Sequence, residues 1–141
     1  MPIYMKFDGI DGEATDGTME VMSFSWGATQ TGGAGGGGGG GGKVNMQDLH
    51  FVKISDKSSP VLLRSCATGK HIPWAEVRVR ESPTRQSAGR FHFYKIRLED
   101  VVVSSYEIGG NEHGAPAPVD QVALKYAKFR FDVGEQTPDD Q

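Results

Sequence analysis

The cysteine and the serines are the residues to consider first for nucleophilic chemistry. Cys66 lies five residues before His71, near the end of a predicted helix, where the negative end of the helix dipole disfavours a thiolate. No G-x-S-x-G stretch or other nucleophile elbow surrounds any serine. The neighbouring carboxylates Glu99 and Asp100 would face opposite sides of a strand, which is unsuited to shared acid–base work. The sequence therefore predicts no catalytic residue and no enzyme, and Cys66 is interpreted as a small core residue.

The histidines and the acidic turns do not form a metal-binding pattern. Four histidines recur at intervals of 21 residues: His50, His71, His92 and His113. We interpret this regularity as coincidence, because no H-E-x-x-H stretch and no Cys/His pairs of zinc spacing accompany it. Counted from Asp8, the third and fifth positions of a calcium loop would be Ile10 and Gly12, which carry no side-chain oxygen. The sequence predicts ordinary Asp-Gly turns here, with a metal ion as the minor alternative.

The glycine-rich stretch ends in a lysine, as a phosphate-binding loop does. Gly37, Gly42 and Lys43 match the spacing of a P-loop. However, Val44 stands where the Mg²⁺-binding Ser or Thr belongs, and a predicted strand follows instead of a helix. Ten of the residues from 32 to 42 are glycine, which buries no side chain and loses the most backbone entropy on ordering. We therefore expect no cofactor, and interpret residues 31–43 as a long hairpin extension.

Length and charge limit the remaining classes of function. The chain has 141 residues and a mass of 15.2 kDa, which is most simply one domain, and its single cysteine forms no internal disulfide. A net charge of -3, with Lys and Arg scattered among the acids, argues against a nucleic-acid partner. The N-terminal sequence lacks a leader pattern, and no run approaches the roughly 18 apolar residues of a membrane span. We expect synthesis in the cytoplasm without a signal peptide and without a membrane span.

Alternation of apolar and polar residues predicts six strands. Phe24 and Trp26 oppose Ser23 and Ser25, which gives one strand an apolar face and a hydroxyl face. In three longer segments, 44–54, 90–108 and 122–133, the apolar phase changes partway, which indicates a β-bulge or burial on both faces. Six bulged strands with one helix predict a mainly β fold, a closed six-stranded antiparallel β-barrel, since closure removes sheet edges.

One segment has the start and stop signals of a helix. We expect Ser59 to cap it, Pro60 to occupy the first helical position and Gly69 to end it after Thr68. Its predicted apolar stripe consists of Leu62, Leu63, Cys66 and Ala67. At roughly 14 Å such a helix is too short to persist alone, so it must lie on the flank of the sheet.

A small barrel cannot cover apolar residues on both faces of its strands. Four aromatic residues fall in segments where the phase changes: Phe91, Phe93, Phe129 and Phe131. Contacts with other subunits would bury them, so we take these four residues as candidates for a subunit interface.

The order of motifs resembles the Hcp family, the haemolysin-coregulated inner-tube proteins of bacterial type VI secretion systems. The resemblance covers essentially the whole chain and is carried by Trp26-Gly27, the glycine-rich loop, and the blocks GKVNMQDLHFVK, DKSSPVLLRSCATGKH and LEDVVVSSYEIGG. It implies a six-stranded barrel with a flanking helix, assembled as a homo-hexameric ring. Rings of this family stack into a tube that a contractile sheath expels, with a VgrG-like spike protein at the tip and effector proteins in the lumen. The uniform glycine run is a departure from the family.

Roles for individual residues follow from the resemblance and the strand pattern together. Ser23 and Ser25 are candidates for the lumen face, because they oppose Phe24 and Trp26. Candidates for contact between rings come from the long loop: Thr31, Gly32, Gly33, Gly42 and Lys43. On the helix, Arg64 and Lys70 are candidates for facing outward, toward an acidic sheath surface.

The expected domain comprises residues 1–134, followed by a short polar tail, 135–141, without an added effector domain. Two alternatives to a secretion tube remain open. A phage-type tail-tube protein would use the same architecture. A solitary barrel that binds a small ligand would be a monomer with a convergent polar pocket.

Overall fold

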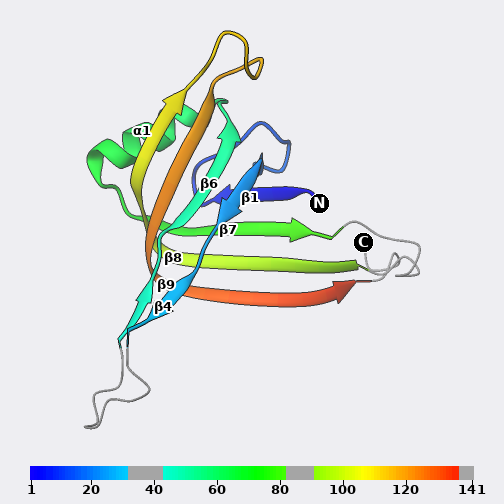
Figure 1. The fold of residues 1–141 in the computed structure, drawn as a ribbon, viewed down its shortest axis with the longest axis vertical. Coiled ribbons are helices and arrows are strands. Elements are labelled where there is room, and N and C mark those ends of the chain that lie inside the picture. Colours follow the sequence, from blue (N-terminus) through cyan, green and yellow to red (C-terminus); the bar gives the residue numbers. More distant parts are fainter. Residues whose placement is uncertain (32–42, 82–90, 137–141) are drawn as a thin grey trace.

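A computed structural model describes residues 1–31, 43–81 and 91–136, which form one helix and nine strands (Figure 1). In chain order the elements are β1 (Ile3–Phe7), β2 (Met19–Glu20), β3 (Ser23–Ser25), β4 (Ala28–Gln30), β5 (Val44–Met46), β6 (Leu49–Ile54), α1 (Ser59–Thr68), β7 (Ile72–Arg80), β8 (Phe91–Gly109) and β9 (Val119–Gln136). The fold is mainly β, as predicted. Strand β9 continues two residues beyond position 134, where the barrel domain was expected to end.

The main sheet has the order β2-β1-β7-β8-β9-β6-β3 and is antiparallel throughout. The prediction of a closed barrel is wrong, because no ladder joins the edge strands β2 and β3. Instead, the short segment between them crosses the gap. The Val21 amide donates to the Ile3 carbonyl at 2.9 Å, and the Met22 amide donates to the Val52 carbonyl at 2.7 Å. The amides of two consecutive residues, Val21 and Met22, thus hydrogen-bond to strands on opposite sides of the gap, but no continuous strand closes it.

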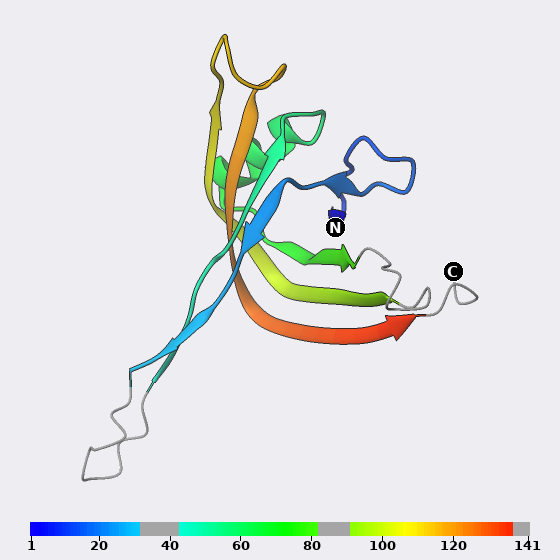
Figure 2. The ribbon, with the colours of Figure 1, turned by 45° about the vertical axis from the view of Figure 1, so that its right-hand side comes forward.

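The long hairpin of β8 and β9 bends sharply and divides the molecule into two halves (Figure 2). At the bend, Trp74 pairs with Glu99 and Ile72 with Val101, so the register is the same on both sides of Asp100, which adopts a left-handed φ of 54°. The β8–β9 ladder shifts its register once, between Val103 and Ser105. The phase changes along β8 therefore coincide with the left-handed residue Asp100 and with this one register shift. We call the part with α1 and β6 the helix half, and the part with β1, β7 and residues 91–99 and 128–136 the open half.

The N-cap residue and the buried face of the helix differ from the prediction. Ser58, not Ser59, is the N-cap residue, and its side chain makes no capping hydrogen bond, whereas Gly69 ends the helix with a φ of 68° as expected. The predicted stripe is partly wrong: Leu62 is buried, but Leu63 is 50% exposed and Ala67 is exposed. The buried side chains on the helix are Ser59, Leu62 and Ser65. The helix is rotated because Ser59 is held by a buried polar network, described below.

The core fills the space enclosed by the curved sheet and the helix. It is built by the inward positions of every long strand together with Leu62 of α1. The two-stranded sheet of β4 and β5 lies outside it and projects from one end of the body, while the loop between β8 and β9 extends at the other end (Figures 1 and 2). The molecule therefore has two extensions at opposite ends of its long axis.

Candidate subunit interface

The inner face of the open half is only partly covered. Phe129, Phe131 and Val133 of β9 pair across β8 with the inward residues Leu98, Ile96 and Tyr94. They nevertheless remain 49%, 54% and 55% exposed. In the described chain, these three residues extend the core face to the surface. Exposed apolar side chains that continue a core indicate a surface that binds another molecule.

The same strand has an unpaired backbone edge. Strand β6 pairs with β9 only from Val119 to Leu124. From residue 125 onward, β9 pairs with β8 alone among the described strands. An edge strand presents a row of backbone N–H and C=O groups that can pair with another chain. The apolar side chains and the free edge therefore lie on one and the same strand.

Trp26 connects this strand to the rest of the barrel. Its ring lies edge-on to Phe129 and Phe131, with centroids 5.3 and 6.1 Å away. Its indole N–H donates to the Tyr126 hydroxyl, which in turn donates to the Gln47 carbonyl at 2.8 Å. These contacts fix the position of β9 relative to β3 and β5, so the exposed surface is held in place rather than left loose.

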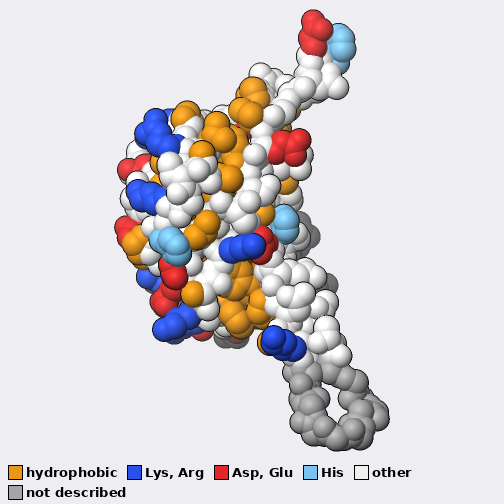
Figure 3. All heavy atoms as spheres, turned by 90° about the vertical axis from the view of Figure 1, so that its left-hand side faces the viewer, with side chains coloured by type: hydrophobic (Ala, Val, Ile, Leu, Met, Phe, Trp, Pro, Cys, Tyr) orange, Lys and Arg blue, Asp and Glu red, His pale blue; other side chains and the backbone are white. Residues whose placement is uncertain are grey.

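An apolar groove lies beside this cluster. Its volume is about 460 Å³, and its described lining residues are Met1, Phe24, Trp26, Val79, Glu81, Tyr94, Ile96 and Phe131. Glu81 is the only charged residue among them, and its carboxylate contacts His92 at 2.9 Å. Figure 3, which views the molecule from the side of α1 and the bend, shows further hydrophobic side chains gathered in a band, with charged side chains of both signs along one margin.

The four predicted interface phenylalanines do not share one surface. Phe91 is only 2% exposed, with the Arg80 guanidinium 4.2 Å from its ring centre, so it offers almost no surface to a partner. Phe93 pairs with Gly134 on the outer face, where its ring occupies the space that a side chain at position 134 would need. Only Phe129 and Phe131 lie together on the exposed inner face.

A buried charged network completes the helix half, and the sequence reading missed it. Lys53 and Asp120 pair across β6 and β9, and the side chains of both are fully buried. The Lys53 ammonium lies 3.0 Å from Asp120 and 2.9 Å from Asp56. Hydroxyl groups of Ser55, Ser59 and Tyr106 donate to the remaining positions of the Asp120 carboxylate. Strand and helix are thereby joined through one carboxylate.

Burial and hydrogen bonding have opposite effects on the pKa values of the carboxylates in this network. Burial alone would raise the pKa of Asp120, but the hydrogen bonds from Ser55, Ser59, Tyr106 and Lys53 outweigh it and lower the pKa. Asp56 has a lowered pKa for the same balance of burial against hydrogen bonds from Ser58 and Lys53. Burial and donation to Asp120 raise the pKa of Tyr106 to about 12. Both carboxylates are therefore charged near neutral pH.

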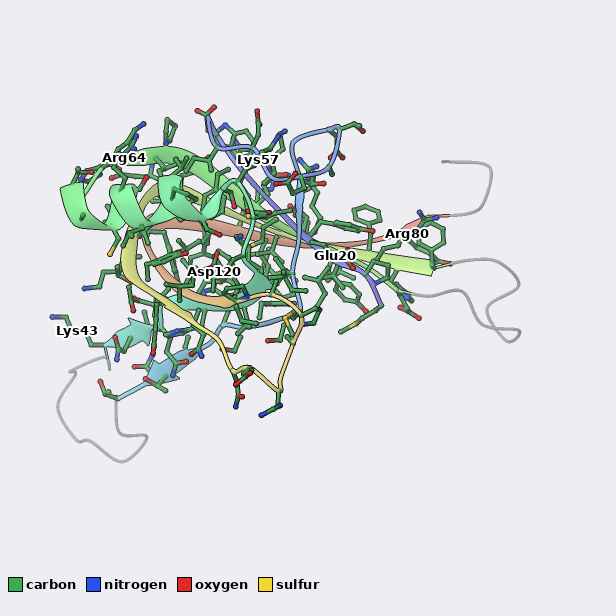
Figure 4. All side chains as sticks on the ribbon, turned by 90° about the horizontal axis from the view of Figure 1, so that it is seen from above. Glu20, Lys43, Lys57, Arg64, Arg80 and Asp120 are labelled. Atoms are coloured by element: carbon green, nitrogen blue, oxygen red, sulfur yellow. The ribbon has the colours of Figure 1, made fainter. Side chains whose placement is uncertain are left out.

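The other predicted site residues lie at separate places. Ser23 and Ser25 are exposed. Thr31 and Lys43 face each other at the loop end of the β4–β5 hairpin, where the Thr31 hydroxyl donates to the Lys43 carbonyl at 3.0 Å. Gly32, Gly33 and Gly42 lie outside the described residues. In Figure 4, Arg64 points away from the body on the outer side of α1, and Lys43 lies far from Asp120. Lys70 is also exposed.

The described residues contain no metal-binding cluster and no helix that could span a membrane. No group of three or more His, Cys, Asp or Glu side chains among them could bind a metal ion. All four histidines are exposed, with His71 next to Asp100 and His92 next to Glu81. No helix in the described part of the chain is both long and apolar enough to cross a membrane.

Comparison with known proteins identifies the class. The model of the family described as "Type VI secretion system effector, Hcp" matches residues 4–133. Protein hcp1 of Pseudomonas aeruginosa is 37% identical over 97 residues, which are 69% of this chain and 57% of that protein. The match thus spans little more than half the length of that curated relative.

Solved structures agree with this comparison. Hcp1 from Salmonella typhimurium has a TM-score of 0.72 and 29% identity, covering 96% of this chain and 93% of that one. A structure described as a type six secretion system protein has a TM-score of 0.76 and 27% identity, covering 92% and 82%. The chain belongs to the Hcp family of type VI secretion system proteins. This family consists of secreted structural tube proteins rather than enzymes.

Proposed function

We propose that this chain is the structural subunit of a type VI secretion tube, in which six copies form a ring and rings stack. The observation that carries the proposal is the incomplete open half. An unpaired β9 edge lies beside Phe129 and Phe131, which are about half exposed. A protein that stayed alone in solution would expose both an aggregation-prone edge and apolar surface. A neighbouring copy would cover both at once.

The groove supports this proposal better than it supports a ligand-binding barrel. Small-molecule pockets combine an apolar lining with several convergent polar groups that orient the ligand. The described lining of this groove has one carboxylate, Glu81, which is already paired with His92. Apolar lining at a sheet edge fits the core of a protein–protein interface, where charged residues are depleted.

The extension formed by β4 and β5 is suited to contact between stacked rings. The β4–β5 hairpin projects from one end of the body, and Thr31 and Lys43 lie at its outer described end (Figure 1). In the proposed tube this end contacts the next ring, with Gly32, Gly33 and Gly42 continuing the contact. Replacing residues 31–43 by the turn Asn-Gly would leave rings intact and abolish their stacking.

The remaining surfaces are assigned by exposure. Ser23 and Ser25, on the hydroxyl face of β3, line the lumen and touch effector proteins. Arg64 on α1 and Lys70 just after it face the contractile sheath, and a VgrG-like spike protein closes one end of the tube. The chain is made in the cytoplasm without a signal peptide and leaves the cell through the secretion system, into the medium or a target cell.

The mass of the chain in solution tests the ring. We expect light scattering on a sizing column to give six times the 15.2 kDa of one chain. The mass is measured at high and low protein concentration, so that a weak ring is not missed. A monomer at every concentration would contradict the proposal and favour the solitary barrel.

A further inference from the structure

A ring of more than two identical subunits needs two different surfaces on each copy. Its contacts are heterologous, so the surface on one side of a subunit must fit a different surface on the other side. The β9 edge is the first of these two surfaces. The second must also offer exposed apolar side chains, and its charge must match.

The outer face of β9 in the open half carries two exposed basic residues. On the outer face of this strand, Lys128 and Arg130 are exposed and lie opposite Glu99 and Arg97 of β8. Arg97 and Arg130 are thus like charges directly opposite each other, an arrangement that is unfavourable within a sheet. Arg97 is held by Glu76 at 2.7 Å, and Arg130 by Asp132 at 2.9 Å, while no ion pair joins Lys128 to any described residue. An acidic partner would supply the counter-charge that Lys128 lacks in the described chain.

The opposite edge of the sheet has the complementary charge. Residues 8–20 contain five carboxylates and no Lys or Arg. Beside them lies a groove of about 590 Å³ whose lining includes Glu13 and Glu20. Both side chains are exposed.

The same groove also offers apolar surface. Its lining includes Tyr4, Met22 and Ile54, which are 36%, 57% and 45% exposed. The groove lies where β2 ends and the chain crosses to β3, so it marks the gap in the barrel. Strand β2 is at one edge of the sheet order and lies four strands away from β9.

We infer that the β9 edge of one copy docks into the β2 groove of the next copy. Phe129 and Phe131 then cover Tyr4, Met22 and Ile54, while Lys128 and Arg130 face Glu13 and Glu20. This inference rests on the proposed ring and names the two surfaces that form it. Acidic and basic surfaces on opposite edges also give each copy one orientation, because edge-to-edge or groove-to-groove contact would place like charges together.

A charge-swap experiment tests this contact. Variant one carries Lys128→Glu and Arg130→Glu, and variant two carries Glu13→Lys and Glu20→Lys. At low salt we expect the concentration needed for half-assembly to rise at least about tenfold for each variant alone, because like charges then meet at every contact. An equimolar mixture should recover assembly, since the two variants can alternate around a ring with an even number of subunits.

The controls separate this inference from the ring itself. Arg64→Glu with Lys70→Glu makes the same charge change as variant one on the helix surface, and should leave assembly unchanged. Recovery in the mixture also shows that both variants are folded. If the unsubstituted chain forms rings but neither variant weakens them, or the mixture recovers nothing, this contact is wrong while the ring stands. If the unsubstituted chain stays monomeric, both proposals fail.

Discussion

The two halves of the molecule lie on the same pair of long strands but are completed in different ways. In the helix half, α1 covers the sheet and Lys53 and Asp120 are fully buried with every polar atom satisfied by a partner. In the open half, β9 loses its second neighbour and its inward aromatic residues reach the surface. The first half is completed by its own chain, whereas the second is completed by another copy in the proposed ring.

The difference indicates where stability and assembly are encoded. Substitutions in the helix half should change the free energy of unfolding of one chain. Substitutions on the open half should change the association of chains and leave the single chain nearly intact. Each prediction below compares one half with the other.

The largest effect is expected at Asp120. Asp120→Ala leaves the Lys53 ammonium buried next to Asp56 alone and removes an acceptor from three hydroxyl groups. Removing one partner of a buried pair costs about 3–5 kcal/mol, so urea unfolding should show a loss of that size. Asp132→Ala is the matched control in the open half, because Asp132 forms an exposed pair with Arg130 and should change stability by less than about 1 kcal/mol. Equal losses for the two variants would contradict the comparison.

The same network predicts how stability depends on pH. The folded pKa values of Asp120 and Asp56 are lowered relative to about 3.9 in an unfolded chain. Their contribution is therefore present above about pH 4 and is lost as the pH falls through the folded pKa values. We expect the free energy of unfolding to fall less steeply between pH 5 and pH 2 in Asp120→Asn than in the unsubstituted chain. Parallel curves would show that Asp120 is not the group responsible.

Phe131 should show the opposite behaviour. Phe131→Ala removes a side chain that is 54% exposed and packs edge-on to Trp26, so a single chain loses little. At the centre of an interface, however, truncation of an aromatic anchor costs about 2 kcal/mol or more. We expect assembly to weaken roughly thirtyfold per contact while the urea midpoint of the monomer shifts only slightly. Loss of monomer stability without loss of assembly would place Phe131 in the core instead.

The predictable parts of this fold were those set by local pattern. Gly69 ends the helix as expected, and the Ser23 and Ser25 face of β3 is exposed. The two-residue strand β2 and the polar strand β4 have no apolar alternation to reveal them. They form because neighbouring strands offer backbone partners, which is a tertiary effect.

The sequence analysis did not find the charged network, because the alternation of inward and outward positions along β6, and not the residue type, decides which side chains are buried. Lys53 continues the inward positions of Leu49 and Phe51, while the apolar Ile54 points outward and is 45% exposed. A reading by hydrophobicity alone reverses these two positions. The clue was the unbroken alternation from Leu49, which places Lys53 inside once its partner Asp120 is known.

The acidic and basic edges also escaped the sequence reading. Lys and Arg are scattered along the chain, but strand pairing places Lys128 and Arg130 of β9 beside Arg97 of β8. Sheet register joins residues that are more than 30 positions apart. Charge segregation of this kind depends on topology, so composition and net charge do not reveal it.

The bend that separates the two halves gives the smallest predicted effect. Asp100 is the one residue other than glycine with a positive φ in the described chain, and its carboxylate lies 2.6 Å from the His71 ring nitrogen. Asp tolerates the left-handed region better than β-branched residues, which are strained there. Asp100→Val should therefore cost about 1 kcal/mol or slightly more, whereas Asp100→Gly should stay within about 0.5 kcal/mol because it keeps the backbone and loses only an exposed pair. Urea unfolding of both variants measures this, and ring mass reports whether the open half keeps its angle. If Gly costs as much as Val, the side-chain contact with His71, and not the backbone conformation, holds the bend.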